Sequence, residues 1–458
     1  MNTTNSIELT VLGGGGEVGA NCFLLNIDGQ QVVLDCGTHP KKDGMEALPE
    51  FSLLTKAPDA VLISHGHQDH CGSFPYLLRH FPMVRSFSTA PTLRIMDRML
   101  HNSVSVMGLI AKERGIAEYP LYDHGDVNYA LKGTRTHPYE ESFSLGLRVP
   151  VQGSFQRAGH VLGSAGILLN MPNHTLFYTG DYCETPQELL PGSKPLRDDI
   201  QVDTLIIEST HGNTEDDKIK DYQAEARRLG ESTREVLLNG GAVLIPTFAL
   251  GRTQEILNII VRQQEEGLIP DVPVYASGLG RAVYELYDYY PDHLMPNTAL
   301  CPLDRFERIG NVWNQETVER LISRPCIIVA TSGMMLHNTP SAMIAQTMVK
   351  ETHHGIFFVG YLDHETLGYH LLHSERGQEL QFTLKKDAVE VQLENIQRFY
   401  FSAHAPRKSL ARTIERLKPK NVVYVHGDSD AIAWMHENTG NGFSAHAPAI
   451  GQTLTLKA

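Results

Sequence analysis

Three histidines and an aspartate lie within six residues of the sequence, at His65, His67, Asp69 and His70. Neutral imidazole nitrogens and carboxylate oxygens are the ligands that zinc and similar divalent ions take from proteins. Because one glycine separates His65 from His67, both rings can point at a single ion. Asp69 and His70 follow and would face a second point nearby. The segment predicts a metal centre, and the alternative is a chance histidine cluster on a solvated turn.

The flanking residues predict how this segment is held. Residues 60–63, Ala-Val-Leu-Ile, are apolar and partly β-branched, which predicts a buried strand. Residues 74–78, Phe-Pro-Tyr-Leu-Leu, predict a helix with proline in its first turn. The ligands are therefore expected on a tight loop between a strand and a helix, with Asp69 and His70 opening the helix.

Further acidic and imidazole side chains are expected where later strands end. His160 lies among small residues in Ala-Gly-His-Val-Leu-Gly-Ser, Asp181 follows Phe-Tyr-Thr-Gly, and Glu208 follows Leu-Ile-Ile. His404 and His426 each come after an apolar run of the kind that forms strands. A lone histidine is usually structural, but a repeated strand-end pattern is not expected by chance. An aspartate between two ions can bridge them with its two oxygens, and Asp181 is the candidate.

Two features leave alternatives open. Asp35, after the strand predicted at 31–34, is either a turn residue or a group that orients metal ligands. The hexapeptide Phe-Ser-Ala-His-Ala-Pro occurs at 401–406 and again at 443–448. Only the first copy follows a clear predicted strand, so we expect His404 rather than His446 at the site.

The pattern of predicted elements changes along the chain. Residues 7–34 predict a meander of antiparallel strands, with a hairpin turn at Asp28-Gly29. From about residue 211 to 360, strands alternate with helices, which predicts a parallel α/β domain. Histidines and antiparallel patterns return afterwards, so this domain is predicted to be an insertion. The expected fold is α/β, with a first domain at 1–208, an inserted domain at 209–375 and the rest of the first domain at 376–458.

Composition limits the class of protein. The 458 residues carry a net charge of −14, which is the wrong sign for a simple nucleic-acid-binding module. Two bound divalent ions would nevertheless make a cleft locally positive. The six cysteines form no CxxC pair, which favours reduced, buried thiols over thiolate zinc. No apolar run approaches a membrane span, and the polar N-terminus predicts no signal peptide and a cytoplasmic location.

Taken together, these motifs resemble a known family. Asp35, His65-x-His67-x-Asp69-His70, His160 and Asp181, in that order, are similar to the metallo-β-lactamase hydrolase superfamily. Glu208 in ESTHG, His404 in FSAHA and His426 in VHGD, around an inserted α/β domain, resemble its β-CASP nucleases. These include the endonuclease subunit of the mRNA cleavage and polyadenylation factor and its bacterial and archaeal relatives. The phrases PTFALGRTQEIL and TSGMM are similar to the same group.

The resemblance implies a four-layer αββα metallo-β-lactamase fold interrupted by a parallel-sheet β-CASP domain, and two Zn²⁺ ions. A hydroxide between the ions would attack phosphorus, with Asp69 also counted among the catalytic residues. Glu208 and His404 would pair, and His404 would donate a proton to the leaving oxygen. The ligands implied for the first zinc are His65, His67, His160 and Asp181, and those for the second are Asp69, His70, Asp181 and His426.

The resemblance also implies a substrate. A histidine at the position of His426 is associated with RNA-directed family members, so single-stranded RNA is the expected partner, with no membrane partner and with a homodimer as one expected assembly. Phosphate contacts are expected from Arg252, Ser332 and Arg407, although surface arginines are usually just solvated. The sequence departs from the family pattern in ESTHG, where His211 replaces a common tyrosine, and after Met335, where a glycine pair is missing.

Three other functions remain open at this point. They are a DNA nuclease of the same family, a small-molecule hydrolase of the superfamily, and a catalytically silent scaffold subunit of an RNA-processing complex. The inserted domain argues against the small-molecule hydrolase, and the full set of ligands argues against the scaffold.

Overall fold

The computed structural model describes residues 7–215, 220–296, 298–384 and 387–456. The chain divides into two compact units. The first unit comprises Met1–Pro186, Leu190–Lys218 and Ala403–Ala458, and the second comprises Gln187–Leu189 and Ile219–Ser402.

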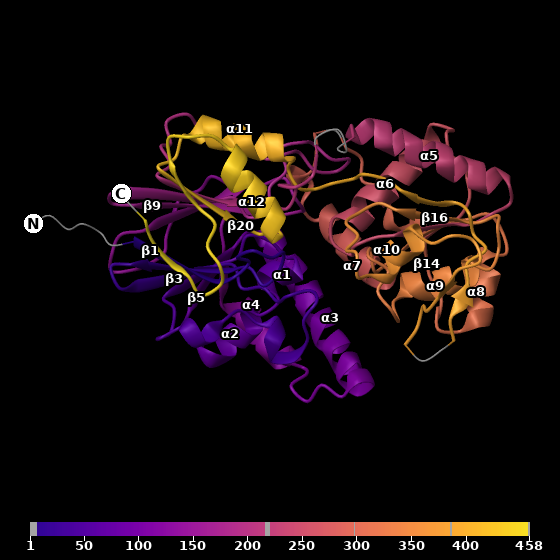
Figure 1. The fold of residues 1–458 in the computed structure, drawn as a ribbon, viewed down its shortest axis with the longest axis horizontal. Helices are drawn as coiled ribbons and strands as arrows, with labels where there is room; N and C mark the ends of the chain where they lie inside the picture. Colours follow the sequence, from indigo (N-terminus) through magenta and orange to yellow (C-terminus); the bar gives the residue numbers. More distant parts are fainter. Residues whose placement is uncertain (1–6, 216–219, 297, 385–386, 457–458) are drawn as a thin grey trace, which may run out of the picture. The chain divides into compact units, whose positions relative to one another are not determined.

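The first unit contains two seven-stranded mixed sheets (Figure 1). One begins as the antiparallel meander predicted from the sequence and continues with parallel strands. In the other, four antiparallel strands are followed by parallel ones. In spatial order, the first sheet is β22 (Thr453–Leu456), β1 (Ile7–Gly13), β2 (Cys22–Ile27), β3 (Gln30–Leu34), β4 (Ala60–Leu62), β5 (Arg85–Ser88) and β6 (Thr134–Thr136). The second is β21 (Ser444–His446), β20 (Asn421–Val425), β11 (Thr204–Glu208), β10 (His174–Tyr178), β9 (Ala165–Met171), β8 (Gln152–Arg157) and β7 (Phe143–Ser144).

The two sheets pack face to face around one apolar core. Leu25 and Val32 of the first sheet belong to the same buried cluster as Phe155, Ile167 and Tyr178 of the second. Alternate side chains of a strand point to opposite faces, so each sheet also presents an outer apolar face. These outer faces are covered by helices, which completes the core of the unit.

Helices lie on both outer faces, as Figure 1 shows. Phe74 and Met96 pack with Val61 on the first sheet, and Leu410 packs with Tyr424 on the second. The unit is therefore the four-layer αββα sandwich that the family resemblance implies. The helices over the first sheet are α1 (Gln68–Cys71), α2 (Phe74–His80), α3 (Ala90–Arg114) and α4 (His124–Gly133), and those over the second are α11 (Arg407–Leu417) and α12 (Ser429–Asn438).

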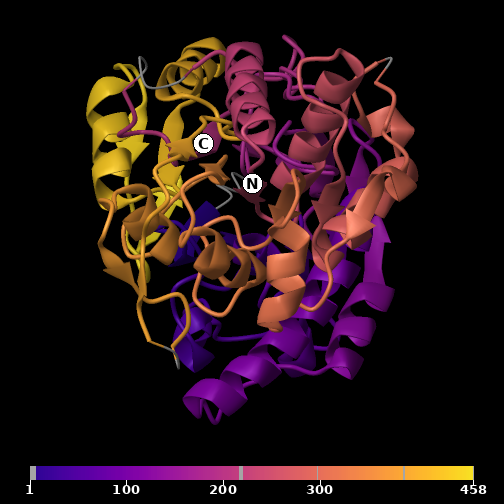
Figure 2. The same ribbon diagram turned by 90° about the vertical axis from the view of Figure 1, so that its right-hand side faces the viewer.

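The second unit is built on a six-stranded sheet whose neighbouring strands are all parallel. Helices alternate with its strands along the chain, which confirms the predicted parallel α/β domain (Figure 2, magenta to orange). In spatial order the strands are β14 (Phe306–Arg308), β13 (Val274–Ala276), β15 (Ile327–Ala330), β12 (Val243–Pro246), β16 (Gly355–Phe358) and β19 (Ile396–Arg398). The helices are α5 (Tyr222–Leu238), α6 (Arg252–Glu265), α7 (Gly278–Asp288), α8 (Gln315–Ile322), α9 (Pro340–Met348) and α10 (Leu367–Leu372), and a small antiparallel pair is formed by β17 (Glu379–Leu380) and β18 (Val389–Glu390).

The boundaries of the units differ from the predicted boundaries of the insertion, 209–375. The longest continuous stretch of the second unit is Ile219–Ser402, so it begins and ends later than predicted. The later boundary follows from strand pairing, because β19 extends the parallel sheet next to β16. The short segment Gln187–Leu189, which precedes the predicted insertion, also belongs to the second unit.

No helix in the described part of the chain is both long and apolar enough to cross a membrane.

Candidate metal centre

The predicted ligands gather at one edge of the first unit, where several strands end. His65 and His67 lie in the loop after β4, and Asp69 and His70 lie in α1. Because β10, β11 and β20 are parallel neighbours, the residues that follow them emerge at the same edge of the sheet. Asp181 and His426 follow β10 and β20, Glu208 ends β11, and His160 follows β8.

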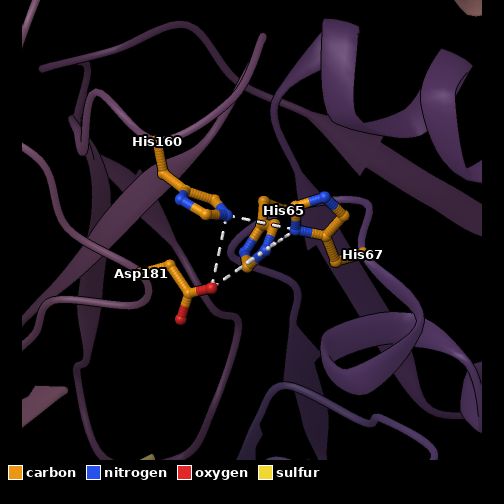
Figure 3. A group of neighbouring side chains, drawn as sticks. All are labelled: His65, His67, His160 and Asp181. Carbon is orange, nitrogen blue, oxygen red and sulfur yellow. Dashed lines mark hydrogen bonds and ion pairs between the residues drawn. The ribbon is translucent and has the colours of Figure 1, made fainter. Parts of the chain in front are cut away.

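Four of these residues form one cluster, shown in Figure 3 with their side chains converging on a common point. His67 Nδ1 lies 3.1 Å from both His65 Nε2 and His160 Nε2. Asp181 Oδ2 lies 3.5 Å from His65 Nε2 and 3.3 Å from His160 Nε2. Ligands about 2.0–2.1 Å from a tetrahedral ion are separated by roughly 3.3 Å, so the cluster fits zinc.

Burial favours the neutral, metal-binding form of two imidazoles of this cluster, His65 and His160. Burial lowers the pKa of His65 well below its usual value, and the neighbouring His70 adds to the effect. Burial likewise lowers the pKa of His160. A neutral ring keeps a free lone pair, and metal binding requires a deprotonated nitrogen. His160 also donates from Nδ1 to the carbonyl oxygen of Ala403 at 2.8 Å, which leaves Nε2 for the ion.

A second cluster contains Asp69, His70 and His426. His426 Nε2 lies 3.2 Å from Asp69 Oδ2, and His70 Nε2 lies 3.7 Å from the same oxygen. Asp181 also faces this cluster, with Oδ1 3.2 Å from His70 Nε2. The nitrogen and oxygen donors again suit zinc.

Asp181 is shared by the two clusters. Oδ2 faces the first cluster and Oδ1 the second, and the residue is only 3% exposed. Oδ1 is buried among imidazoles, 3.2 Å from His70 Nε2 and 3.3 Å from His426 Nδ1. Burying a carboxylate is costly unless cations or other charged partners offset the loss of water. Asp181 therefore has the geometry of a carboxylate that bridges two cations.

Asp35 organises the base of the second cluster. His70 Nδ1 and Tyr178 Oη each donate to Asp35 Oδ2 at 2.7 Å. The backbone N–H of Ser64 donates to Oδ1 at 2.7 Å, and its hydroxyl lies 2.7 Å from Oδ2. A carboxylate behind a ligating histidine fixes the tautomer and the orientation of the ring. This geometry matches the second of the two interpretations of Asp35, orientation of a ligand.

An Asp35→Asn variant tests this orientation. The amide cannot accept the hydrogen bonds of His70, Tyr178 and Ser64 together, so His70 would lose its fixed orientation. We expect the affinity for the second zinc equivalent to fall about 10- to 100-fold. Competition with a chromogenic chelator would measure it, and Tyr178→Phe, which removes one donor and keeps the carboxylate, should have a smaller effect. An unchanged affinity for the second zinc equivalent would contradict the role of Asp35 in orienting His70.

Glu208 and His404 form a pair beside the metal clusters. His404 Nδ1 lies 3.2 Å from both carboxylate oxygens of Glu208, and its Nε2 lies 4.0 Å from Asp181 Oδ2. Glu208 also accepts from the backbone N–H of Tyr182 at 2.8 Å. Burial alone would lower the pKa of His404, but Glu208 and Asp181 outweigh burial and raise it to about 9. The ring can therefore hold a proton near neutral pH and can present Nε2–H toward the clusters.

Several residues that complete the site carried no signal in the sequence. Ser64 and Tyr178 contact Asp35, as described above. Thr210 Oγ1 lies 3.1 Å from His426 Nδ1, and Asn21 Nδ2 lies 3.1 Å from His70 Nε2. Their types are common in loops and strands, and only folding brings them to the ligands.

The residues predicted to contact RNA have protein partners in the structure. Arg252 is 7% exposed and donates to Gln187 Oε1 at 3.3 Å in the second unit. Ser332, in the same unit, accepts from the backbone N–H of Leu336 at 3.0 Å. Arg407, in the first unit, stacks on Trp434 with its guanidinium carbon 4.2 Å from the ring centre. Their contacts with RNA stay predictions.

The second hexapeptide copy lies outside the metal clusters found among the described residues. Its Ser444–His446 is strand β21, which pairs with β20, whereas the first copy lies in the irregular segment before α11. The strand before the first copy, β19, ends at Arg398 and belongs to the parallel sheet of the second unit. His404 therefore reaches the site from a loop, and not from the end of a neighbouring strand as expected.

Three family models match the chain in succession. Residues 15–211 match the metallo-beta-lactamase superfamily, and residues 253–371 match the beta-Casp domain. Residues 388–448 match the Zn-dependent metallo-hydrolase RNA specificity domain, called RMMBL. The three matched segments include every residue of the two clusters and the Glu208–His404 pair.

Curated relatives align over most of the chain. An RNase J-like protein of Methanocaldococcus jannaschii is 30% identical over 91% of this chain and 91% of its own length. Cleavage and polyadenylation specificity factor 73 of Drosophila melanogaster is 29% identical over 93% of this chain, which spans 60% of that protein. The transcription termination factor FttA of Methanosarcina mazei is 30% identical over 93% of this chain and 67% of its own length.

A solved structure shares the fold. A protein of unknown function from Enterococcus faecalis V583 superposes with a TM-score of 0.55 at 13% identity, covering 98% of this chain and 100% of that one.

Proposed function

The chain belongs to the metallo-beta-lactamase superfamily and carries its beta-CASP and RMMBL domains, and we propose that it is a zinc-dependent ribonuclease that hydrolyses RNA phosphodiester bonds. The observation that carries this proposal is the Glu208–His404 pair beside the carboxylate of Asp181, which two ligand clusters share. A proton donor next to a site for two cations suits the displacement of an oxygen from phosphorus.

The ligands present fit two Zn²⁺ ions. His65, His67, His160 and Asp181 would hold one ion, and Asp69, His70, His426 and the other oxygen of Asp181 would hold the second. When bound, such ions supply Lewis-acid stabilisation of both the attacking and the leaving oxygen of an in-line displacement. The ligand side chains would fix the positions of the two ions, and with them the place where that stabilisation acts.

His404 and Glu208 would manage the proton. Hydrolysis breaks the bond between phosphorus and the leaving oxygen, and this oxygen needs a proton as it departs. Glu208 accepts from His404 Nδ1 and fixes the ring, so Nε2–H is the donor that can supply this proton. A general acid of this kind contributes about 10²- to 10⁴-fold to the rate.

Two features support RNA as the substrate. The segment 388–448, which contains His404 and His426, matches a model described as an RNA specificity domain. The family resemblance also associates a histidine at the position of His426 with RNA. The names of the aligned relatives, among them an RNase J-like protein, agree with action on RNA.

The test is a cleavage assay with zinc-loaded protein, using labelled single-stranded RNA and DNA of the same sequence. We expect RNA to be cleaved and the His67→Ala variant, which removes a ligand of the first cluster, to lose this activity. His364→Ala serves as control, because the His364 side chain is 75% exposed and lies outside the clusters. Cleavage of DNA but not RNA would overturn the substrate, and equal activity of His67→Ala would overturn the metal mechanism. No cleavage of either polymer would favour the scaffold.

A further inference from the structure

Two histidines of the first unit meet between α3 and α4, and neither belongs to the ligand clusters described above. His101 lies on α3, and His124 is the first residue of α4. Their Nδ1 atoms are 2.7 Å apart, and the two rings lie almost parallel with their centres 5.0 Å apart. Two helices thus bring two nitrogen atoms together that are both able to bind a metal ion.

The backbone positions of both histidines are fixed by their neighbours. The helices α3 and α4 pack together on the first sheet, and Leu100 of α3 and Val127 of α4 belong to one buried cluster (Figure 1). A capping box holds the first turn of α4. The N–H of Asp126 donates to Asp123 Oδ1 at 2.9 Å, and the N–H of Asp123 donates to Asp126 Oδ2 at 3.0 Å. A ligand that binds the histidine pair therefore meets a preorganised backbone, which lowers the entropy cost of binding.

The second ring nitrogen of His101 faces acceptors. His101 Nε2 lies 3.3 Å from Asn128 Oδ1 and 3.6 Å from Asp97 Oδ1. A proton on Nε2 is therefore donated to Asn128, and the neutral ring keeps its lone pair on Nδ1. An acceptor behind one imidazole nitrogen is the usual arrangement around metal-ligating histidines, because it fixes the tautomer and the ring. His101 Nδ1 is thus presented to His124 as a ligand atom.

The separation of the two Nδ1 atoms indicates a class of ion. Nitrogen ligands about 2 Å from an ion are roughly 3.3 Å apart in a tetrahedron and roughly 2.8 Å apart where they meet at a right angle. The observed 2.7 Å is close to the right-angled value. Right-angled ligand sets are typical of Ni²⁺ and Cu²⁺, whereas structural zinc is tetrahedral. Because His124 and Asn128 are exposed, water can occupy the remaining coordination positions.

Carboxylates lie near the pair on both helices. Asp97 lies one turn before the α3 histidine, and Asp123 directly precedes the α4 histidine. A third carboxylate of this surface, Asp126, lies 3.6 Å from Arg79. The negative charge of Asp97 and Asp123 attracts a divalent cation to the two imidazoles.

We propose that His101 and His124 bind one divalent transition-metal ion of the Ni²⁺ or Cu²⁺ class through their Nδ1 atoms, and that this ion ties α4 to α3. Water completes its coordination, and Asn128 is a positioning residue that orients His101. The alternative is a simple hydrogen bond between two surface histidines. The site lies within the first unit and does not depend on the ribonuclease activity.

The test is a calorimetric titration of the zinc-loaded full chain with Ni²⁺, with a chromogenic chelator reporting any released zinc. We expect about one Ni²⁺ per chain to bind without zinc release, and His101→Ala and His124→Ala each to weaken this binding at least roughly ten-fold. His353→Ala is the matched control. His353 also stacks on a histidine, His354, with ring centres 4.0 Å apart, but His354 Nδ1 already accepts the N–H of Ala242 at 3.0 Å. The control should bind Ni²⁺ as the wild type does.

A variant that strengthens the site tests the role of Asn128. Asn128→Asp places a carboxylate behind His101 Nε2, which raises the basicity of Nδ1, and we expect Ni²⁺ to bind about ten-fold more tightly. Unchanged affinity in this variant would overturn the orienting role.

Hydrogen–deuterium exchange tests the link between the helices. We expect Ni²⁺ to slow exchange in peptides that cover residues 120–128 of the wild type, and to have no such effect in His101→Ala. Absence of Ni²⁺ binding, binding only with loss of zinc, or binding that both alanine variants retain would overturn the site. Binding without slower exchange would overturn the link between α3 and α4. His101 is partly exposed and His124 exposed, so their alanine variants leave the apolar core unchanged.

Discussion

An Asp181→Asn variant is expected to lose zinc from both clusters and to cleave RNA at least roughly a thousand-fold more slowly than the wild type. Bound cations stabilise the transition state of such a reaction by several kcal/mol. Each loss of about 1.4 kcal/mol of this stabilisation lowers the rate ten-fold. The amide keeps the shape of the side chain and removes its charge. Each of the two carboxylate oxygens faces a different cluster, so this one substitution changes a ligand of both clusters.

The negative charge of Asp181 is the property that the Asp181→Asn substitution removes. Burial would raise the pKa of this carboxyl, but His426 and His70 hold it well below its usual value. The group is therefore a carboxylate near neutral pH. An asparagine offers one neutral oxygen and an N–H₂ group that cannot ligate, so one cluster loses its ligand and the other loses the ligand's charge.

The zinc content per chain after dialysis and the initial rate of RNA cleavage measure this result. Asp199→Asn is the control, because it makes the same chemical change at a carboxyl group that is 67% exposed and pairs with Arg197. We expect the control to keep its zinc and its rate. Wild-type zinc content in Asp181→Asn would contradict the role of Asp181 as a shared ligand.

The candidate ligands could be predicted from the sequence because their positions depend on local pattern. A ligand at the end of a predicted strand needs only that the strands be parallel neighbours, and β10, β11 and β20 are. The strand-end pattern predicts the ends of strands as the positions of Asp181, Glu208 and His426, and the pairing of the strands brings these ends to one edge of a sheet. The parallel second unit follows from the alternation of strands and helices, whereas the αββα sandwich is implied by the family resemblance.

The supporting residues could not be predicted, because they depend on tertiary contacts. Tyr178 is an ordinary strand residue until the second sheet brings its hydroxyl to Asp35, 143 positions away. The carbonyl of Ala403 becomes a partner of His160 only when residues 243 positions apart meet. Neither residue spacing nor composition in the sequence indicates that residues so far apart in the chain make contact in the folded protein.

The repeated hexapeptide shows the same limit within one chain. Phe-Ser-Ala-His-Ala-Pro forms an irregular segment before α11 in its first copy and includes strand β21 in its second. Identical local sequence therefore gives two conformations, and the neighbours decide between them. In the second copy β20 offers an open edge that Ser444–His446 pairs with, and its histidine is carried away from the clusters.

This duplication supplies the control for the proton donor. A His404→Ala variant is expected to lower kcat for RNA about 10²- to 10⁴-fold, the usual contribution of a general acid. His446→Ala makes the same change in the same hexapeptide and is expected to leave kcat within about two-fold, because His446 lies outside the clusters. Both variants should keep the zinc content of the wild type.

Two measurements separate a proton donor from a ligand, which matters because His404 also lies close to Asp181 and His426. Loss of zinc from His404→Ala would contradict the proton-donor role and make His404 a ligand. The second measurement uses a p-nitrophenyl phosphodiester, whose leaving oxygen departs without a proton. If His404 protonates the leaving oxygen, the defect of His404→Ala must shrink strongly on this substrate, since the missing proton is no longer needed. An equal loss of kcat on both substrates would contradict protonation of the leaving oxygen by His404.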